Sequence, residues 1–132
     1  MTIKITFRPK DRFARCIYKI SFGERFYIGA ADWLERRMRS HKSTINRLLA
    51  GTLQMNEKND YYCHIITHLQ KYPEIVEGIV TVLEEVPRDV YIFDVEKKWK
   101  RQLSRDGMCL NTTELQYYTE AEIDELQRQL DG

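Results

Sequence analysis

Hydrophobic and polar residues alternate along the first thirty positions of the chain. Over residues 2–7 the apolar side chains are Ile3, Ile5 and Phe7, at every second position, which predicts a β-strand. Residues 16–22 also alternate, and after Gly23 and Glu24 an apolar stretch resumes at residues 26–28. Two such stretches joined by a two-residue turn with glycine predict a β-hairpin.

The pattern then changes to the helical period over residues 32–49. Apolar positions recur three and four residues apart, which is typical of a helix with one buried stripe. That stripe consists of Leu34, Met38, His41, Ile45 and Leu48. Asp32, with Glu35 three residues later, matches a capping box at the start of this helix, and Gly51 matches a C-terminal cap.

Five further elements follow from the same patterns. Residues 61–72 predict a second helix that Pro73 ends, and residues 74–85, nearly continuous in β-branched residues, predict a central strand buried on both faces. A third helix is expected from residue 88 or 89 to about residue 105, and a short last strand over residues 108–111. From Thr119 an acidic amphipathic helix is expected.

These elements predict the α+β type of α/β fold, with a small central, mostly antiparallel sheet flanked by helices. We expect residues 1–132 to form one domain with its core at about 14–112, preceded by the extra strand and followed by the acidic helix. The composition, 42% hydrophobic and 31% charged, is that of an ordinary globular protein. No apolar run approaches the ~18 residues of a membrane span, no signal-peptide core is found at the N-terminus, and three cysteines suit a reducing compartment. We therefore expect a cytoplasmic protein that does not enter membranes.

Charge is polarised along the chain, although the net charge is only +1. Residues 1–50 hold 12 Lys and Arg against 4 Asp and Glu, whereas residues 51–132 hold 9 against 16. A polyanion would be drawn to the first half. The alternative is that the two halves fold against each other and neutralise, so charge alone does not decide between them.

Several side chains in these elements could carry chemistry. Arg37 lies one turn before His41 on the same side of its helix, so both groups could reach one phosphate. Without the preceding hairpin His41 would be interpreted as a core histidine and Arg37 as a surface charge, and with the hairpin the functional interpretation is favoured. Glu96 shares an apolar helical stripe with Ile92 and Trp99. A carboxylate on such a stripe needs a partner or a metal ion, because leaving it charged and unpaired costs several kcal/mol.

Two tripeptides and their spacing connect these residues to a known family. Residues 16–18, Cys-Ile-Tyr, and residues 27–29, Tyr-Ile-Gly, are followed by Arg37 eight residues after the glycine and by His41 four residues later. This arrangement resembles the signature of the GIY-YIG nuclease superfamily. Taken singly, each tyrosine is more simply a strand residue that packs a hairpin.

The resemblance extends to the C-terminal half. Glu96 and Trp99 are similar to the family's third motif, and Asn111 matches the asparagine that ends the pattern, although a lone asparagine is also a common turn residue. Two positions depart from the family: Lys100 replaces an apolar residue, and Cys16 replaces the first glycine. Neither departure removes a group that takes part in the chemistry.

The resemblance implies a GIY-YIG-like fold and a metal-dependent endonuclease that hydrolyses the phosphodiester bonds of DNA with Mg²⁺ or Mn²⁺ and no small-molecule cofactor. Glu96 would hold the metal, Arg37 would neutralise the phosphate, Tyr18 would take the proton of the attacking water, and Tyr27 and His41 would orient the phosphate and the water. Further DNA contacts are expected from Arg36, Arg39, Lys42 and Asn111. The alternative is a domain of the same fold that binds nucleic acid or a protein without cutting.

Two further possibilities stay open at this point. Cys63, His64 and His68 have a spacing that could hold zinc, but no second ligand pair supports it and a structural role is favoured. A homodimer is plausible because one active site cuts one strand at a time, although no heptad pattern supports it.

Overall fold

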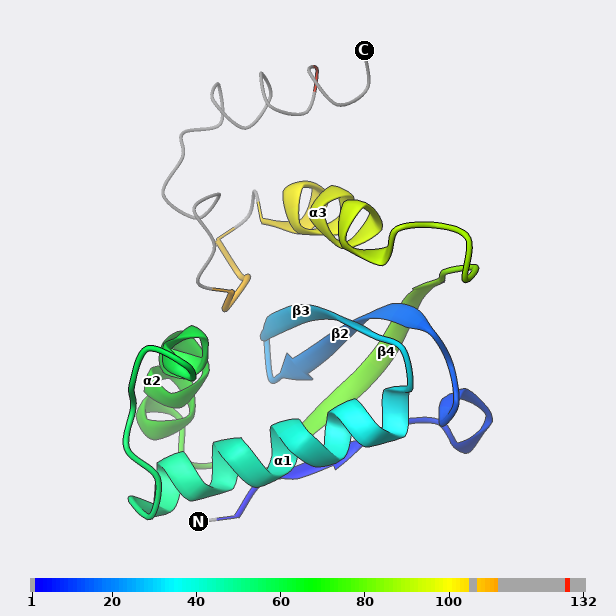
Figure 1. Cartoon of the computed structure of the whole chain (residues 1–132). Coiled ribbons are helices and arrows are strands. Elements are labelled where there is room, and N and C mark those ends of the chain that lie inside the picture. The colour runs from blue at the N-terminus through cyan, green and yellow to red at the C-terminus, as the bar shows by residue number, and fades with distance from the viewer. Residues whose placement is uncertain (1, 105–106, 112–127, 129–132) are drawn as a thin grey trace.

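The computed structural model describes residues 2–104, 107–111 and 128, and within them it shows an α+β fold with three α-helices and one four-stranded sheet (Figure 1). The elements in order are β1 Lys4–Thr6, β2 Cys16–Phe22, β3 Arg25–Ala31, α1 Leu34–Ala50, α2 Cys63–Lys71, β4 Glu77–Glu85 and α3 Ile92–Leu103, with short 3₁₀ turns at Pro9–Asp11 and Asp60–Tyr62. The predicted fold class, with helices flanking a sheet, is confirmed. None of the described helices is long and apolar enough to span a membrane.

The sheet is mixed, with strand order β1-β4-β2-β3. The predicted hairpin forms the antiparallel pair β2–β3, and β4 pairs antiparallel with β2 and parallel with β1. In the hairpin Tyr18 lies directly opposite Gly29. The sheet is therefore mostly antiparallel, and β3 is one of its two outer strands.

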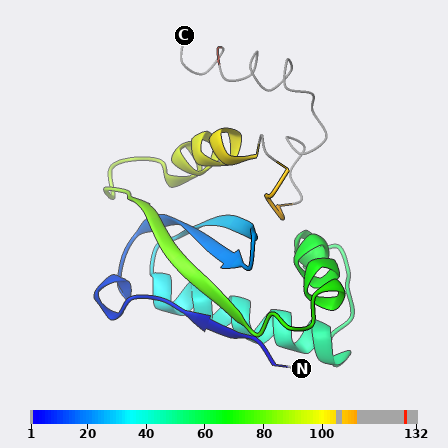
Figure 2. The same ribbon diagram turned by 180° about the vertical axis from the view of Figure 1, so that it is seen from behind.

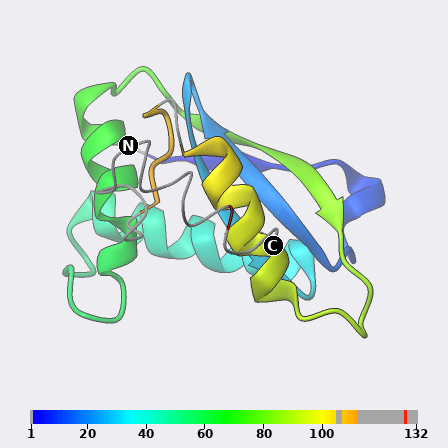
Figure 3. The same cartoon turned by 90° about the horizontal axis from the view of Figure 1, so that it is seen from above.

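Both faces of the hairpin are covered, because helices lie on opposite sides of it (Figures 1 and 3). On one side β2 packs against α1 and α2 through a large apolar cluster that contains Tyr18, Ile20, Met38, Ile45 and Ile65. On the other side α3 packs on β2 and β3 through a smaller cluster that contains Ile17, Ile28, Ile92 and Trp99. The predicted stripe of α1 is buried along its whole length.

The predicted capping box at the start of α1 is wrong. The helix begins at Leu34, and no side chain caps it. Backbone carbonyls of the preceding loop accept the first helical N–H groups instead: Leu34 N donates to Ala14 O at 3.1 Å and Glu35 N to Arg12 O at 2.9 Å. The two acids are thereby free to bind arginines, Asp32 with Arg15 and Glu35 with Arg12, each at 2.9 Å.

The strand predicted over residues 74–85 is central in the sheet, but its burial on both faces is wrong. In β4 buried and exposed positions alternate, and Ile79 is 55% exposed. On this face only the end of β4 near α3 is covered: Leu83 packs on the α3 cluster and Glu84 accepts a hydrogen bond from Trp99 at 2.9 Å, whereas Ile79 lies farther along the strand. In Figure 2 β4 runs along the near side of the molecule up to the loop that leads to α3. A nearly continuous run of hydrophobic residues in β4 therefore does not mean that both faces of this strand are buried.

Two other boundaries differ from the prediction. The third helix begins at Ile92 because the carbonyls of Pro87 and Val90 accept hydrogen bonds from Arg15, at 2.5 and 3.2 Å. Residues 108–111 lie along β3 but form a single bridge, Phe26 with Cys109, in place of the predicted strand. The helix predicted from Thr119 falls outside the described residues.

Candidate active site

A pocket of about 310 Å³ opens where β3, α1 and α3 meet. Four of the predicted site residues line it: Tyr27 from β3, Arg37 from α1, Glu96 from α3, and Asn111. The rest of the lining consists of Gly29, Ala30, Tyr61, Phe93 and Lys100. Side chains from these three elements and from Asn111, which follows Tyr27 by 84 positions in the sequence, thus converge on one concave surface.

Tyr18 lies beneath this pocket and does not line it. Its side chain is fully buried, and its ring crosses Gly29 so closely that a β-carbon at that position would stand 2.3 Å from the phenol oxygen. Glycine is needed there because no methyl group can share that space. The glycine of the second tripeptide therefore makes room for the tyrosine of the first.

His41 connects two buried phenols. Its Nε2 lies 2.5 Å from the Tyr18 oxygen and its Nδ1 lies 2.6 Å from the Tyr62 oxygen. The guanidinium of Arg37 lies close enough to the Tyr18 oxygen to affect the pKa of the phenol. A neutral imidazole has one N–H donor and one acceptor nitrogen, so it can donate to one of these phenols and accept from the other. Of the two alternatives for His41, the structure shows the core histidine, because the side chain is fully buried and does not line the pocket.

Burial determines the protonation of this network. Burial, and secondarily the charge of Arg37, lowers the pKa of His41 to about 3, so the imidazole is neutral at neutral pH. Burial raises the pKa of Tyr18 and of Tyr27, and Arg37 opposes this rise only in part. Both tyrosines are consequently neutral phenols.

The cation and the acid of the pocket have different surroundings. Burial alone would lower the pKa of Arg37, but the phenol oxygens of Tyr18 and Tyr27 hold it above its ordinary value, so the guanidinium stays charged. Glu96 is half-buried, and its carboxylate lies 3.5 Å from the ammonium of Lys100, one helical turn later. The predicted partner of Glu96 on its apolar stripe is thus, in this structure, a lysine.

Asn111 binds the backbone of the neighbouring strand. Its amide oxygen accepts from Ile28 N at 2.8 Å and its amide nitrogen donates to Ile28 O at 2.7 Å. The side chain is 2% exposed. Both ends of the amide are used by β3, so Asn111 fixes the wall of the pocket next to Gly29.

The other three predicted DNA contacts, Arg36, Arg39 and Lys42, are exposed on α1 and do not line the pocket. Arg39 pairs with Glu35 at 3.3 Å. Their role toward DNA stays a prediction.

Comparisons of the chain with protein-family models, curated proteins and solved structures found no match. The resemblance to the GIY-YIG superfamily therefore rests on the residues themselves.

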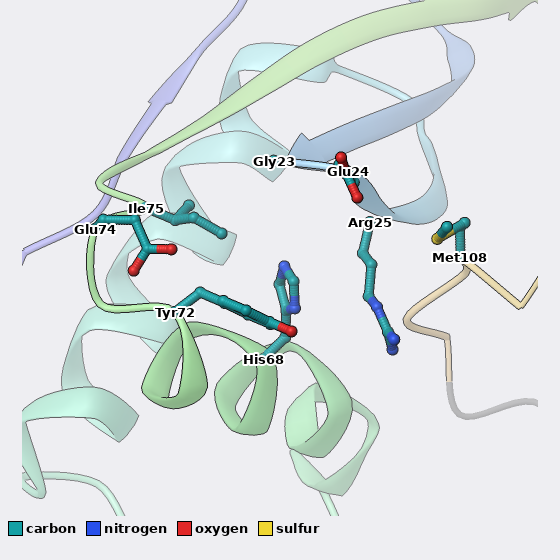
Figure 4. A pocket seen from close by; sticks show the side chains of 8 residues that line it. All are labelled: Gly23, Glu24, Arg25, His68, Tyr72, Glu74, Ile75 and Met108. Carbon is teal, nitrogen blue, oxygen red and sulfur yellow. The ribbon is translucent and has the colours of Figure 1, made fainter.

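The zinc alternative finds no support in the part of the chain that the structure describes, where no group of three or more His, Cys, Asp or Glu could hold a metal ion. His68 turns toward the hairpin, and its Nε2 lies 2.8 Å from Phe22 O. Figure 4 shows it beside Tyr72 at a second pocket of about 350 Å³, on the turn side of the hairpin. His68 therefore joins α2 to the sheet.

Sequence reasoning missed Tyr62 and Lys100. Lys100 follows Glu96 by four residues, a spacing that brings side chains together on a helix, so the pair was detectable. Tyr62 comes from a turn 21 positions after His41, and nothing in the local pattern indicates that contact.

Proposed function

We propose that this chain is a metal-dependent DNA endonuclease that hydrolyses phosphodiester bonds with a GIY-YIG type of active site. The observation that carries the proposal is the convergence of Tyr27, Arg37 and Glu96 on one pocket, above the hydrogen-bonded pair of Tyr18 and His41. These are the five residues that the motif spacing singled out before any geometry was known.

The donor set of the pocket fits a magnesium ion. Mg²⁺ keeps several of its waters and binds through one or two carboxylates together with phosphate oxygens of a substrate. Glu96 is the carboxylate that would hold it, and Lys100 is the cation that it would displace. A bound Mg²⁺ or Mn²⁺ supplies Lewis-acid polarisation of the phosphate.

Arg37 is suited to bind a non-bridging oxygen of the scissile phosphate. Its guanidinium is charged at any working pH, and it lies close to the phenols of Tyr18 and Tyr27. Charge on the phosphoryl oxygens grows as water attacks, so a fixed guanidinium stabilises the transition state more than the ground state.

Tyr27 is the phenol that faces the pocket, and we assign to it the orientation of the attacking water or of a phosphate oxygen. Tyr18, expected to take the proton of the water, is enclosed and hydrogen-bonded to His41, with Arg37 nearby. We therefore propose that Tyr18 and His41 are positioning residues that fix Arg37 and the floor of the pocket.

Cleavage of supercoiled plasmid in Mg²⁺ or Mn²⁺ tests the proposal. We expect nicked circles from the wild type, none in EDTA, and roughly 100-fold or greater loss of rate in Glu96→Gln. Asp94→Asn, an exposed carboxylate on the same helix, is the matched control and should cut normally. Equal cutting by Glu96→Gln and wild type would show that the acid is not the metal ligand.

A nucleic-acid-binding domain that does not cut is the second candidate. The ion pair between Lys100 and Glu96 favours it, because the acid is already neutralised without a metal. It replaces the nuclease proposal if the wild type leaves plasmid, branched and single-stranded DNA intact while it still binds them.

A further inference from the structure

A second hollow adjoins the candidate active-site pocket. It measures about 320 Å³ and is lined by Arg15, residues 30–32 and residues 91–93. We call it the base pocket. It shares Ala30 and Phe93 with the first pocket, so the two lie side by side at the end of β3 and the start of α3.

The base pocket has aromatic walls. Tyr91 is 65% exposed and Phe93 is 50% exposed, and their rings lie 5.5 Å apart at an interplanar angle of 69°. The alanines at positions 30 and 31 are small and leave the space between the rings and β3 open. Exposed rings that border a concave site are typical of surfaces that stack flat ligands.

The two charged residues of the base pocket, Arg15 and Asp32, form an ion pair, and Arg15 also binds backbone carbonyls next to the pocket. The guanidinium of Arg15 binds Asp32 at 2.9 Å and the carbonyls of Val86, Pro87 and Val90 at 2.5 to 3.2 Å. Arg15 is thereby committed to the loop that leads to Tyr91 and is not available to a phosphate. The ligand that this surface suits is flat and uncharged.

We propose that the base pocket binds one unpaired nucleobase of the substrate strand, next to the phosphate held in the first pocket. This inference rests on the proposed function. A base reaches a pocket beside its own phosphate only when it leaves the duplex stack, which costs least where the base is already unpaired. The preferred substrate is therefore DNA with an unpaired nucleotide at the cleaved position, such as a bulge, a flap or a single strand.

Binding measured by fluorescence anisotropy in EDTA tests this without cleavage. The probes are a labelled duplex, the same duplex with one bulged nucleotide, and the bulged duplex with an abasic site at that nucleotide. We expect the wild type to bind the bulge on the order of tenfold tighter than either other probe, because stacking of one base on an aromatic ring has about this effect. Tyr91→Ala should abolish the difference, Tyr91→Phe should keep it, and Val76→Ala, exposed before β4, should leave it unchanged.

The outcomes separate the two proposals. An equal preference in Tyr91→Ala and wild type, or equal binding of the abasic and intact bulges, overturns the base pocket. Plasmid nicking without any preference for the bulge overturns the base pocket and leaves the nuclease proposal standing. A bulge preference that depends on the Tyr91 ring supports the base pocket even if no DNA is cut, in which case only the nuclease proposal fails.

Discussion

The phenol oxygen of Tyr18 and Nε2 of His41 lie 2.5 Å apart in a fully buried contact between the hairpin and α1. The imidazole in this contact is neutral, because burial lowers the pKa of His41 to about 3. A neutral histidine in the core makes the stability of the fold depend on pH.

We expect His41 to make the protein acid-sensitive. Its pKa is about 3 in the fold and 6.5 in the unfolded chain, so below pH 6.5 the unfolded state takes up a proton that the folded state does not. The contribution of neutral His41 to the free energy of unfolding is complete above pH 6.5. It is lost as the pH falls toward 3, by up to about 1.4 kcal/mol per pH unit. Urea unfolding at pH 7 and pH 4.5 measures it.

The variant His41→Gln should be less stable at pH 7 but should lose less stability between pH 7 and pH 4.5 than the wild type. Ile45→Val, on the same buried stripe, is the control: its cost of about 1 kcal/mol should be equal at both pH values. Parallel pH curves for His41→Gln and wild type would contradict the assigned protonation.

Gly29→Ala should displace the Tyr18 ring. The added β-carbon would stand 2.3 Å from the Tyr18 oxygen, so the ring or β3 must shift, at about 1 to 3 kcal/mol of stability. Gly51→Ala is the matched control: its φ of +77° makes alanine strained by about 1 kcal/mol, but the space around it is open. Both variants should unfold at lower urea concentrations, and only Gly29→Ala should lose DNA cleavage. Normal cleavage by Gly29→Ala would mean that the position of Tyr18 is unimportant.

Arg15→Met should destabilise the fold by about 2 to 4 kcal/mol, because it leaves carbonyls of the loop before α3 without their donor. Arg15→Lys should restore little of this, since one ammonium cannot reproduce the spread of the guanidinium. Arg12→Met, which breaks an ion pair whose arginine is 51% exposed, should cost less than about 1 kcal/mol. Urea unfolding compares the three, and equal losses in Arg12→Met and Arg15→Met would refute the role given to Arg15.

Lys100→Met should bind Mn²⁺ on the order of fivefold more tightly, because the ammonium no longer competes for the Glu96 carboxylate. Electron paramagnetic resonance of free Mn²⁺ measures the affinity directly. Lys97→Met, exposed on the same helix, should bind as the wild type does. An unchanged affinity in Lys100→Met would place the metal away from Glu96.

Local periodicity predicted the elements that build the site. Alternation over residues 16–28 is enough to place Tyr18 and Tyr27 on the hairpin, and the stripe of α1 is enough to bury His41 and to leave Arg37 at its margin. These features depend on neighbours within one or two turns of chain, and a sequence shows such neighbours directly.

What the pattern could not predict depends on competition between distant groups. Asp32 stands at the position of an N-terminal cap of α1, but its carboxylate binds Arg15, and backbone carbonyls of the preceding loop accept the first N–H groups of the helix. The same arginine delays the start of α3 to Ile92. Tyr18 was expected to face the substrate, yet its depth beneath the pocket is decided by Gly29 and by the packing of α1 against the sheet.

The two bonds between Asn111 and Ile28 have a consequence for assembly. They satisfy the N–H and C=O of Ile28 that an outer strand would otherwise offer, and Met108 and Leu110 bond Phe26 in the same way. Strand addition from another polypeptide is thereby blocked along this rim, while the opposite rim, β1, is only three residues long. A continuous intermolecular sheet through residues 26–28 of β3 is therefore excluded as long as Asn111 holds its place.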